Sequence, residues 1–551
     1  MPEREPARGP EPPAEDRGAH GTHGTRGTRG TRDVTALCLW TVVLAVLLPA
    51  LVLYGQEVRT GPAFAVQCVV VVHTGTALAR VLTDTRLRVV ALGFWLFCHV
   101  WLGLAPLAML ATDSYPWGFS VDSGTAFTAT VVVEAGLLAY SAGSALAGRR
   151  PYRTSAVLEP LLARRPAPVR VLLLCAAALL LAAALVPAQG GIEAFLTSRQ
   201  ALNEAAAQGD PDGSANRALM AWVLSVPAFW ALVALVHVPR AEGGDRVLRG
   251  LRWMLLPVVV AVNAVVNNPV SQPRFWAGTV LLTLVFGASA LRRAHAFRMG
   301  ALAVTAAILV VFPYGDYFRT DKREPIEVVS LAEQFTSNGD YDAFQQIATG
   351  LDYVRVNGHD PATALGPPLF FVPRAAWPGK PEDVGITLAR HAGYSFDNLS
   401  SPVWIESYIW GGFPGVVAVF ALLGAVGRRV DEVRHRLRGH GATLAALVVP
   451  AFGFYQLILL RGSLMFVMGP LTLLLAVPLL ISTRARRRGP EPPPAPPGAR
   501  RAGGGTEAVP GPGRDAGSAP GGSPPPTPPP AAADGTHRTT PTPLPTGEAR
   551  T

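Results

Sequence analysis

The sequence predicts an all-α integral membrane protein with about twelve transmembrane helices and one large extracytoplasmic loop between the ninth and tenth spans. The first observation is composition, because 49% of the residues are hydrophobic and only 16% are charged. The second is pattern, because the apolar residues form blocks of roughly 20 residues, as in helices that cross a bilayer, instead of amphipathic stripes. The third is the placement of Arg and Lys, which alternates from one connection to the next.

The apolar blocks define the predicted spans. The first block, Val34 to Tyr54, is long enough to cross a bilayer, and no small-residue cleavage site follows it. We therefore expect a retained helix and no cleaved signal peptide. The other spans are expected at about residues 62–79, 89–111, 125–147, 171–188, 218–238, 253–267, 275–291, 299–315, 402–427, 442–460 and 464–482.

The basic residues give the orientation. The connections after the even-numbered spans carry 25 Arg and Lys, whereas the short connections after the odd-numbered spans carry 5. The positive-inside rule then places both termini in the cytoplasm and the long loop outside. Only two lysines occur, Lys322 and Lys380, and this bias toward Arg with abundant Ala, Gly and Pro favours a bacterium with a GC-rich genome. The expected location is the bacterial cell membrane.

Composition shifts divide the chain into five predicted regions. The net charge of +10 does not indicate nucleic acid, because the basic residues form short clusters between apolar blocks. The four cysteines all lie inside apolar blocks, so neither a disulfide framework nor a zinc site is expected. The regions are a disordered cytoplasmic tail (1–33), helices one to nine (34–315), an extracytoplasmic loop or cap (316–401), helices ten to twelve (402–482) and a disordered Pro- and Gly-rich cytoplasmic tail (483–551).

The long loop contains a predicted amphipathic helix. Loops of this length are usually functional or disordered. Residues 340–357 place Phe344, Ile347, Leu351 and Val354 on one helix face, with Asn338 or Asp340 as the N-cap. That face needs a cover, which is either the bilayer surface or the mouth of the helix bundle.

Span ten is predicted to be interrupted. Ser400 and Ser401 before Pro402 form a plausible cap and first turn. About two turns later the helix meets Gly411, Gly412, Pro414 and Gly415. A broken helix at membrane depth is tolerated where neighbours or water satisfy the freed backbone groups, so we expect a cavity near Glu406.

Several charged residues are candidates for a site at the outer face. Outward helix ends and the adjoining loop carry four arginines and a lysine, and guanidinium groups make forked hydrogen bonds to diphosphates. The competing interpretation for any one of them is an anchor in the lipid headgroups. Glu406 lies one turn inside a span, where an ionised carboxylate must have a charged or hydrogen-bonding partner or contact water. Glu134 lies deeper in its span and needs a partner, for example an Arg. His391 and His359 could serve as general bases or be merely solvated. The basic residues are Arg274, Arg319, Arg374, Lys380 and Arg461.

The stretch from Phe371 to Gly415 resembles the Wzy-type oligosaccharide repeat-unit polymerases of bacterial O-antigen and exopolysaccharide synthesis. The resemblance rests on PRAAWPGKP at Pro373–Pro381, on Ser401-Pro402, on the E-x-Y of Glu406–Tyr408 and on the G-x-x-G of Gly412–Gly415. Beyond about 45 residues the likeness is one of topology alone. Some members also carry Arg, ten residues and Gly, a spacing found here from Arg355 to Gly366 and from Arg374 to Gly385, both within one loop.

The resemblance implies a metal-independent membrane glycosyltransferase that needs no cofactor. A growing glycan on undecaprenyl diphosphate would enter an outward cavity, and a hydroxyl of a second lipid-linked repeat unit would attack its anomeric carbon. Glu406 or His391 would take the hydroxyl proton. The implied partners are the lipid-linked substrate, membrane lipids, a chain-length regulator and a flippase, but not nucleic acid. The implied diphosphate ligands are Arg374, Lys380, Arg461, Arg274 and Arg355.

Two other functions remain open on the sequence. An O-antigen ligase would share the topology and the lipid donor but use another acceptor, and the H-N-x-hydrophobic motif associated with ligases is absent from the long loop. A transporter or flippase would show two similar halves, which a single large loop between spans nine and ten does not favour. A polyprenyl-phosphate-dependent glycosyltransferase is disfavoured because residues 55–61 offer only one acid, Glu57.

Overall fold

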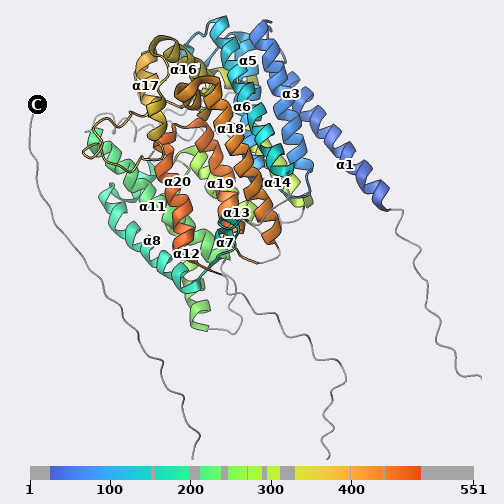
Figure 1. Cartoon of the computed structure of the whole chain (residues 1–551). Coiled ribbons are helices and arrows are strands. Elements are labelled where there is room, and N and C mark those ends of the chain that lie inside the picture. The colour runs from blue at the N-terminus through green and yellow to red at the C-terminus, as the bar shows by residue number, and fades with distance from the viewer. Residues whose placement is uncertain are drawn as a thin grey trace, which may run out of the picture. The chain divides into compact units, whose positions relative to one another are not determined.

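The chain was analysed as a computed structural model that describes residues 25–149, 155–197, 211–237, 246–269, 271–287, 294–310, 329–396, 399–438 and 441–484. These residues are almost entirely helical, and the two-residue strands β1 (Arg165–Pro166) and β2 (Ser482–Thr483) form an antiparallel pair. Arg319, most of both predicted tails, the end of predicted span nine (311–315) and residues 316–328 of the predicted loop lie outside the described residues. Figure 1 shows the helical bundle.

Eight of the described helices are long and apolar enough to cross a membrane, which makes this an all-α, multi-pass membrane protein. The predicted spans seven, eight, nine and twelve correspond to shorter apolar helices. Eight of the twelve predicted spans are therefore confirmed as helices long enough to cross a membrane. The long helices are Val34–Leu53, Pro62–Thr83, Val89–Thr112, Ser123–Arg149, Pro168–Ala188, Leu219–His237, Val403–Leu437 and Leu444–Arg461. The shorter ones are Gly250–Val266, Arg274–Gly287, His295–Ile308 and Leu464–Leu480.

The helices and short helical turns have the following bounds, in chain order. The first helix begins at Thr25, inside the stretch predicted as a disordered tail. The bundle elements are α1 (Thr25–Val42), η1 (Val43–Leu47), α2 (Leu48–Leu53), α3 (Pro62–Thr83), α4 (Val89–Phe97), η2 (Cys98–Leu104), α5 (Ala105–Thr112), η3 (Pro116–Gly118), α6 (Ser123–Arg149), α7 (Leu158–Leu162), α8 (Pro168–Ala188), α9 (Gly191–Leu196), α11 (Pro211–His237), α12 (Arg246–Val266), α13 (Arg274–Gly287), α14 (Ala294–Val310), α18 (Val403–Leu437), α19 (Leu444–Arg461) and α20 (Leu464–Leu480). Between α14 and α18 lie α15 (Leu331–Ser337), η6 (Gly339–Tyr341), α16 (Ala343–Asn357), η7 (Pro361–Leu365) and α17 (Val384–Ala392).

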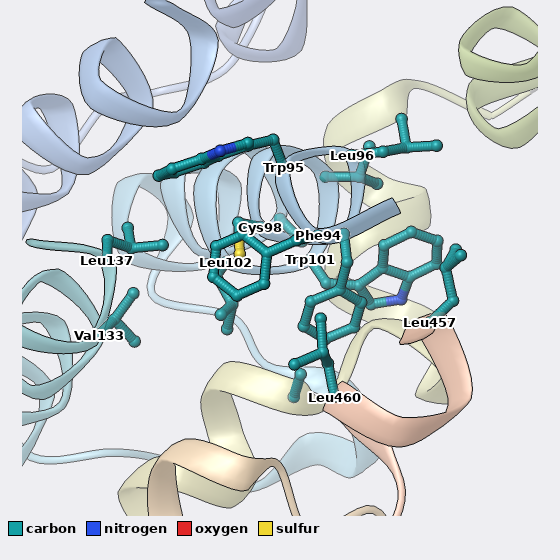
Figure 2. Close-up of a cluster of buried hydrophobic side chains, with 14 of the residues drawn as sticks. Phe94, Trp95, Leu96, Cys98, Trp101, Leu102, Val133, Leu137, Leu457 and Leu460 are labelled. Carbon is teal, nitrogen blue, oxygen red and sulfur yellow. The ribbon is translucent and has the colours of Figure 1, made fainter. Parts of the chain in front are cut away.

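The central helix is the continuous run α4–η2–α5, whose apolar window is completely buried. Figure 2 shows its aromatic and aliphatic side chains, among them Phe94 and Trp101, packed with residues of α6 and α19. The middle of this run is π-helical, and Pro106 has no N–H to donate to the carbonyl of Leu102. The buried amide of Gln67 on α3 donates to that carbonyl at 2.8 Å, so a neighbouring helix satisfies the freed group.

The helices α6 and α18 approach closely through glycines. A Cβ at Gly143 would lie 2.0 Å from the carbonyl oxygen of Ala421, and a Cβ at Gly424 would lie 2.1 Å from that of Tyr140. Small residues of this kind let two membrane helices bring their backbones together. This packing fixes α18, which carries Glu406, against the bundle.

The segment before α18 folds into a helical cap, residues 329–396, and confirms the predicted amphipathic helix as α16. Phe344 and Ile347 are fully buried. The predicted cap of this helix, Asn338 or Asp340, is wrong, because its N-cap is Asp342; Asn338 instead caps the preceding turn η6 by accepting a hydrogen bond from the N–H of Asp340. The cover is the mouth of the bundle, because a Cβ at Gly350 would lie 2.0 Å from the side chain of Ile405 on α18. Figure 1 shows α16 and α17 at the end of the bundle where α18 begins.

The interruption of span ten is confirmed, with corrections at both ends of its helix. Gly411 and Gly412 leave helical geometry, and Gly412 adopts φ +60° and ψ −148°. The predicted serine cap is wrong, because the N-cap is Pro402 and no side chain caps the helix. The helix also continues to Leu437 through the predicted connection 427–441, since that stretch holds no proline and the Arg428–Glu432 pair at i,i+4 supports it.

Candidate functional site

The structure divides the seven predicted site residues into three groups at the cap end of the bundle. Arg461, Arg274 and Glu406 lie where the cap meets the membrane helices. Arg374 and Lys380 lie together in the loop between η7 and α17. His391 and Arg355 meet at a shared carboxylate on the cap.

Arg461, at the end of α19, is an internal ion-pair partner. Its guanidinium donates to Asp342 at 2.9 Å and to the carbonyl oxygen of Gly339 at 2.9 Å. Ser400 donates to the same carboxylate oxygen at 2.7 Å. The side chain of Asp342 is only 2% exposed, and burial raises its pKa while the charge of Arg461 opposes that rise. Arg461 therefore ties the cap to the bundle.

Arg274 forms the second ion pair between the bundle and the cap. At the start of α13 it pairs with Asp340 at 2.7 Å. The indole N–H of Trp101 on the central helix donates to the backbone carbonyl of Asp340 at 2.8 Å. The guanidinium of Arg461 lies 5.4 Å from the ring centroid of Phe275, so the two arginines belong to one cluster.

Glu406 is a helix cap in this structure. Its side chain is almost completely buried, and the carboxylate accepts a 2.7 Å hydrogen bond from the N–H of Leu464, the first residue of α20. A carboxylate at a helix N-terminus satisfies an otherwise unpaired N–H and interacts favourably with the helix dipole. Glu406 is therefore buried at a helix junction, with its carboxylate paired to a backbone N–H.

A second acid reaches the same junction. Ser463, the N-cap of α20, donates to Asp383 at 2.8 Å, and Asp383 in turn accepts from the N–H of Gly385 to cap α17. Burial raises the pKa of Asp383, whereas these hydrogen bonds lower it. The junction thus joins α17, α18 and α20.

Arg374 and Lys380 shape their own loop. The exposed guanidinium of Arg374 donates to the carbonyl oxygens of Lys380 at 2.7 Å and of Pro381 at 3.3 Å. The ammonium of Lys380 donates to the carbonyls of Phe370 at 2.6 Å and Val372 at 3.0 Å. Partial burial, and secondarily the nearby Arg374, lowers the pKa of Lys380. Two cations stand side by side at the surface of the cap.

His391 belongs to an acid–base pair. Its Nε2 lies 2.9 Å from Asp352 on α16, and Arg355 binds the other oxygen of that carboxylate. The hydrogen bond from His391, helped by Arg355, lowers the pKa of Asp352. The imidazole is 19% exposed and meets the ring of Tyr353 edge-on at 5.4 Å. With Nε2 held by the carboxylate, Nδ1 is the nitrogen left to exchange a proton.

His359 has a structural place at the break in α18. Its Nδ1 lies 2.9 Å from the carbonyl of Tyr408, and the N–H of Asp360 donates to the carbonyl of Ile409 at 2.9 Å. These two carbonyls lose their usual partners because Gly411 and Gly412 leave the helix. The cap therefore satisfies the backbone groups that the break frees.

Sequence reasoning missed the acidic partners. Asp352, Asp342 and Asp340 each hold a predicted site residue, yet only Asp340 was considered, as a helix cap. The spacing of Asp352 and Arg355 at i,i+3 on a predicted helix is a usable signal. For Asp342 the contact to Arg461 joins residues far apart in the chain, and no local pattern indicates it.

Whether a metal could bind depends on how the acidic and histidine side chains of the described residues are grouped. Among the described residues no group of three or more His, Cys, Asp or Glu side chains could hold a metal ion. The chemistry that these groups offer is proton transfer at His391 and anion binding at Arg374, Lys380 and Arg355.

No protein-family description, curated protein or solved structure matches this chain.

Proposed function

We propose that this chain is a membrane glycosyltransferase that joins undecaprenyl-diphosphate-linked oligosaccharide repeat units into a surface polysaccharide. In this proposal the bundle has twelve spans in a bacterial cell membrane, both termini are cytoplasmic and the cap faces outward. The observation that carries the proposal is the His391–Asp352 pair on the cap, which has the geometry of a general base oriented by a carboxylate.

The reaction would use His391 as the base. Nδ1 takes the proton of the acceptor sugar hydroxyl, and the oxygen attacks the anomeric carbon of the lipid-linked donor. The bond from that carbon to the diphosphate oxygen breaks, and the diphosphate leaves with the electron pair. Asp352 stabilises the imidazolium that forms. The activated donor supplies the driving force.

The leaving diphosphate needs cations that the substrate can reach. Arg374 and Arg355 are exposed on the cap, and Lys380 lies beside Arg374. Guanidinium groups bind diphosphate oxygens through paired, charge-assisted hydrogen bonds. We assign these three residues to the diphosphate.

Three predicted site residues take another role in this proposal. Arg461 and Arg274 are committed to Asp342 and Asp340, and Glu406 is committed to the N-terminus of α20. Groups that are paired with largely buried partners hold the cap on the bundle and position the reacting residues. They are positioning residues rather than the base or the diphosphate ligands.

The test is complementation of a strain that lacks the gene. We expect His391→Gln and Asp352→Asn to abolish long glycan chains on a gel while single repeat units remain. Arg390→Gln is the matched control, because Arg390 precedes His391 on α17 and its one ion-pair partner among the described residues is the surface residue Glu382. Membrane levels of each variant are compared by immunoblot.

The outcomes separate the alternatives. A full-length ladder with His391→Gln at normal membrane levels would overturn the assigned base. Loss of all transfer to the final acceptor, with polymer retained on the lipid, would indicate a ligase. Absence of lipid-linked units from the outer face would indicate a flippase.

A further inference from the structure

A cavity of about 430 Å³ lies at the end of the bundle opposite the cap. It opens among the last turns of α3 and α6, the start of α4 and the later part of α18. Its size falls in the range of small-molecule sites, roughly 300 to 1,000 Å³. The lining residues are His73, Ala77, Arg80, Val81, Arg88, Trp95, Tyr140, Ser141, Ser144, Ala145, Gly148, Arg149 and Arg428.

The lining is strongly cationic. It contains four arginines and a histidine but no Asp or Glu. Arg88 is paired with Asp84 at 2.8 Å and Arg428 with Glu432 at 2.9 Å, so these two are partly neutralised.

The other two lining arginines, Arg80 and Arg149, are free to bind an anionic ligand. Arg80, in the last turn of α3, and Arg149, at the end of α6, are both exposed and form no ion pair within the described part of the chain. Two unpaired guanidinium groups at the rim of one cavity attract an anion.

The inner wall of the cavity includes polar side chains that are fixed by hydrogen bonds to one another and to Glu134. His73 lies 2.8 Å from Glu134 through Nδ1 and 3.3 Å from the hydroxyl of Ser141 through Nε2. The sequence had suggested an Arg as the partner of Glu134, and the structure assigns that place to His73. The Trp95 ring, 5.4 Å from His73, closes one side. Hydroxyl groups therefore lie near the fixed imidazole inside a cationic rim.

The helices α3 and α6, which line the cavity, also carry exposed apolar side chains. Val69 and Val72 on α3 and Leu138 and Leu146 on α6 are 51% to 59% exposed. On helices long enough to cross a membrane, such side chains face lipid tails. A ligand with a phosphate and acyl chains could enter from the bilayer, and a soluble phosphate could enter from the membrane surface.

We propose that this cavity is a binding site for a phosphate group, supplied by an anionic phospholipid headgroup or by a soluble phosphate compound. Arg80 and Arg149 would bind the phosphate oxygens through charge-assisted hydrogen bonds, with Arg88, Arg428 and the serine hydroxyls behind them. The site is separate from the cap and does not rest on the proposed function.

The test measures binding to the full chain in a neutral detergent, at constant ionic strength so that screening is equal. The probes are inorganic phosphate, glycerol phosphate, a short-chain phosphatidylglycerol and the corresponding phosphatidylcholine. We expect a phosphate-bearing anionic probe to bind the wild type and the double variant Arg80→Gln, Arg149→Gln to bind it at least about tenfold more weakly, as loss of charged hydrogen bonds predicts.

Arg86→Gln is the matched control, because Arg86 is exposed in the connection between α3 and α4 but does not line the cavity. It should bind like the wild type. Binding of phosphatidylglycerol alone would identify a lipid headgroup as the source, and binding of the soluble phosphates alone would identify a soluble ligand. No binding of any anionic probe, equal binding of phosphatidylcholine, or equal loss in Arg86→Gln would overturn the proposal.

Discussion

At the scale of single residues, the cations of the cap end divide into partly buried, ion-paired residues and exposed residues, and the sequence does not distinguish these two classes. Arg461 has a partner that is 2% exposed, whereas Arg374 is exposed and bonds to two backbone carbonyls of its own loop. A buried charge that loses its partner stays desolvated, so removing one member of such a pair is costly. When an exposed arginine is removed, water solvates the groups that it contacted.

Arg461→Ala is therefore expected to destabilise the protein by about 3 to 5 kcal/mol, because Asp342 would remain buried without its countercharge. Arg374→Ala, the matched exposed control, should cost less than about 1 kcal/mol. Both values come from unfolding of the purified protein in detergent. Equal costs would contradict the assignment of Arg461 as the tie between cap and bundle.

The residues of the site were predictable in kind but not in their partners. The positions of Arg274 and Arg461 at helix ends follow from the sequence, and both lie there. That Glu406 bonds the N–H of Leu464 depends on how α18 meets α20, which no local pattern determines. The sequence therefore indicated that the Glu406 carboxylate must be paired or wet, but not which group pairs with it.

At the scale of elements, α18 shows how a break in a membrane helix is stabilised. Gly412 adopts φ +60° and ψ −148°, a region that residues with a Cβ rarely occupy. The carbonyls freed beside it are bonded by His359 and by the N–H of Asp360. The break is thus coupled to the cap, and its glycine is a conformational requirement.

Gly412→Ala is expected to destabilise the protein by about 1 to 3 kcal/mol through backbone strain. A Cβ there would also lie 3.3 Å from the imidazole of His359. Gly411→Ala is the matched control, because φ at Gly411 is −172° and a Cβ there meets nothing within 4 Å. The thermal midpoints of the two variants in detergent provide the comparison, and a larger loss in Gly411→Ala would refute the explanation.

Secondary structure was more predictable than tertiary packing. The apolar stripe that includes Phe344 and Ile347 indicated α16 because a helix of that period has one buried face. Its cover was left open between the bilayer and the bundle mouth, since periodicity does not say what lies opposite. The contact of Gly350 with Ile405 answers that question through packing between distant segments.

At the scale of the whole molecule, the cavity and the cap lie at opposite ends of one bundle and the basic residues are unevenly shared between the two ends. The cavity end carries the four arginines that line it. At the cap end, Arg274, Arg461 and Arg355 are paired with Asp340, Asp342 and Asp352, and Arg374 and Lys380 bond to backbone carbonyls. Arg and Lys in the short connections between spans are retained on the cytoplasmic side of membrane proteins. The connections after the even-numbered predicted spans, which include 80–88 and 148–170 at the cavity end, carry 25 of them, and the short connections after the odd-numbered spans carry 5. The cap should therefore face outward.

This orientation can be measured with two single cysteines in a background from which the four native cysteines have been removed. Leu365, in the cap, is 53% exposed, and Val157, between α6 and α7, is 76% exposed. We expect a membrane-impermeant maleimide to label Leu365→Cys in intact cells and Val157→Cys only after the membrane is opened. The reverse pattern would place the cap in the cytoplasm, where no outward-facing lipid-linked glycan could reach His391, and would remove the proposed polymerase while leaving the phosphate site to be tested on its own.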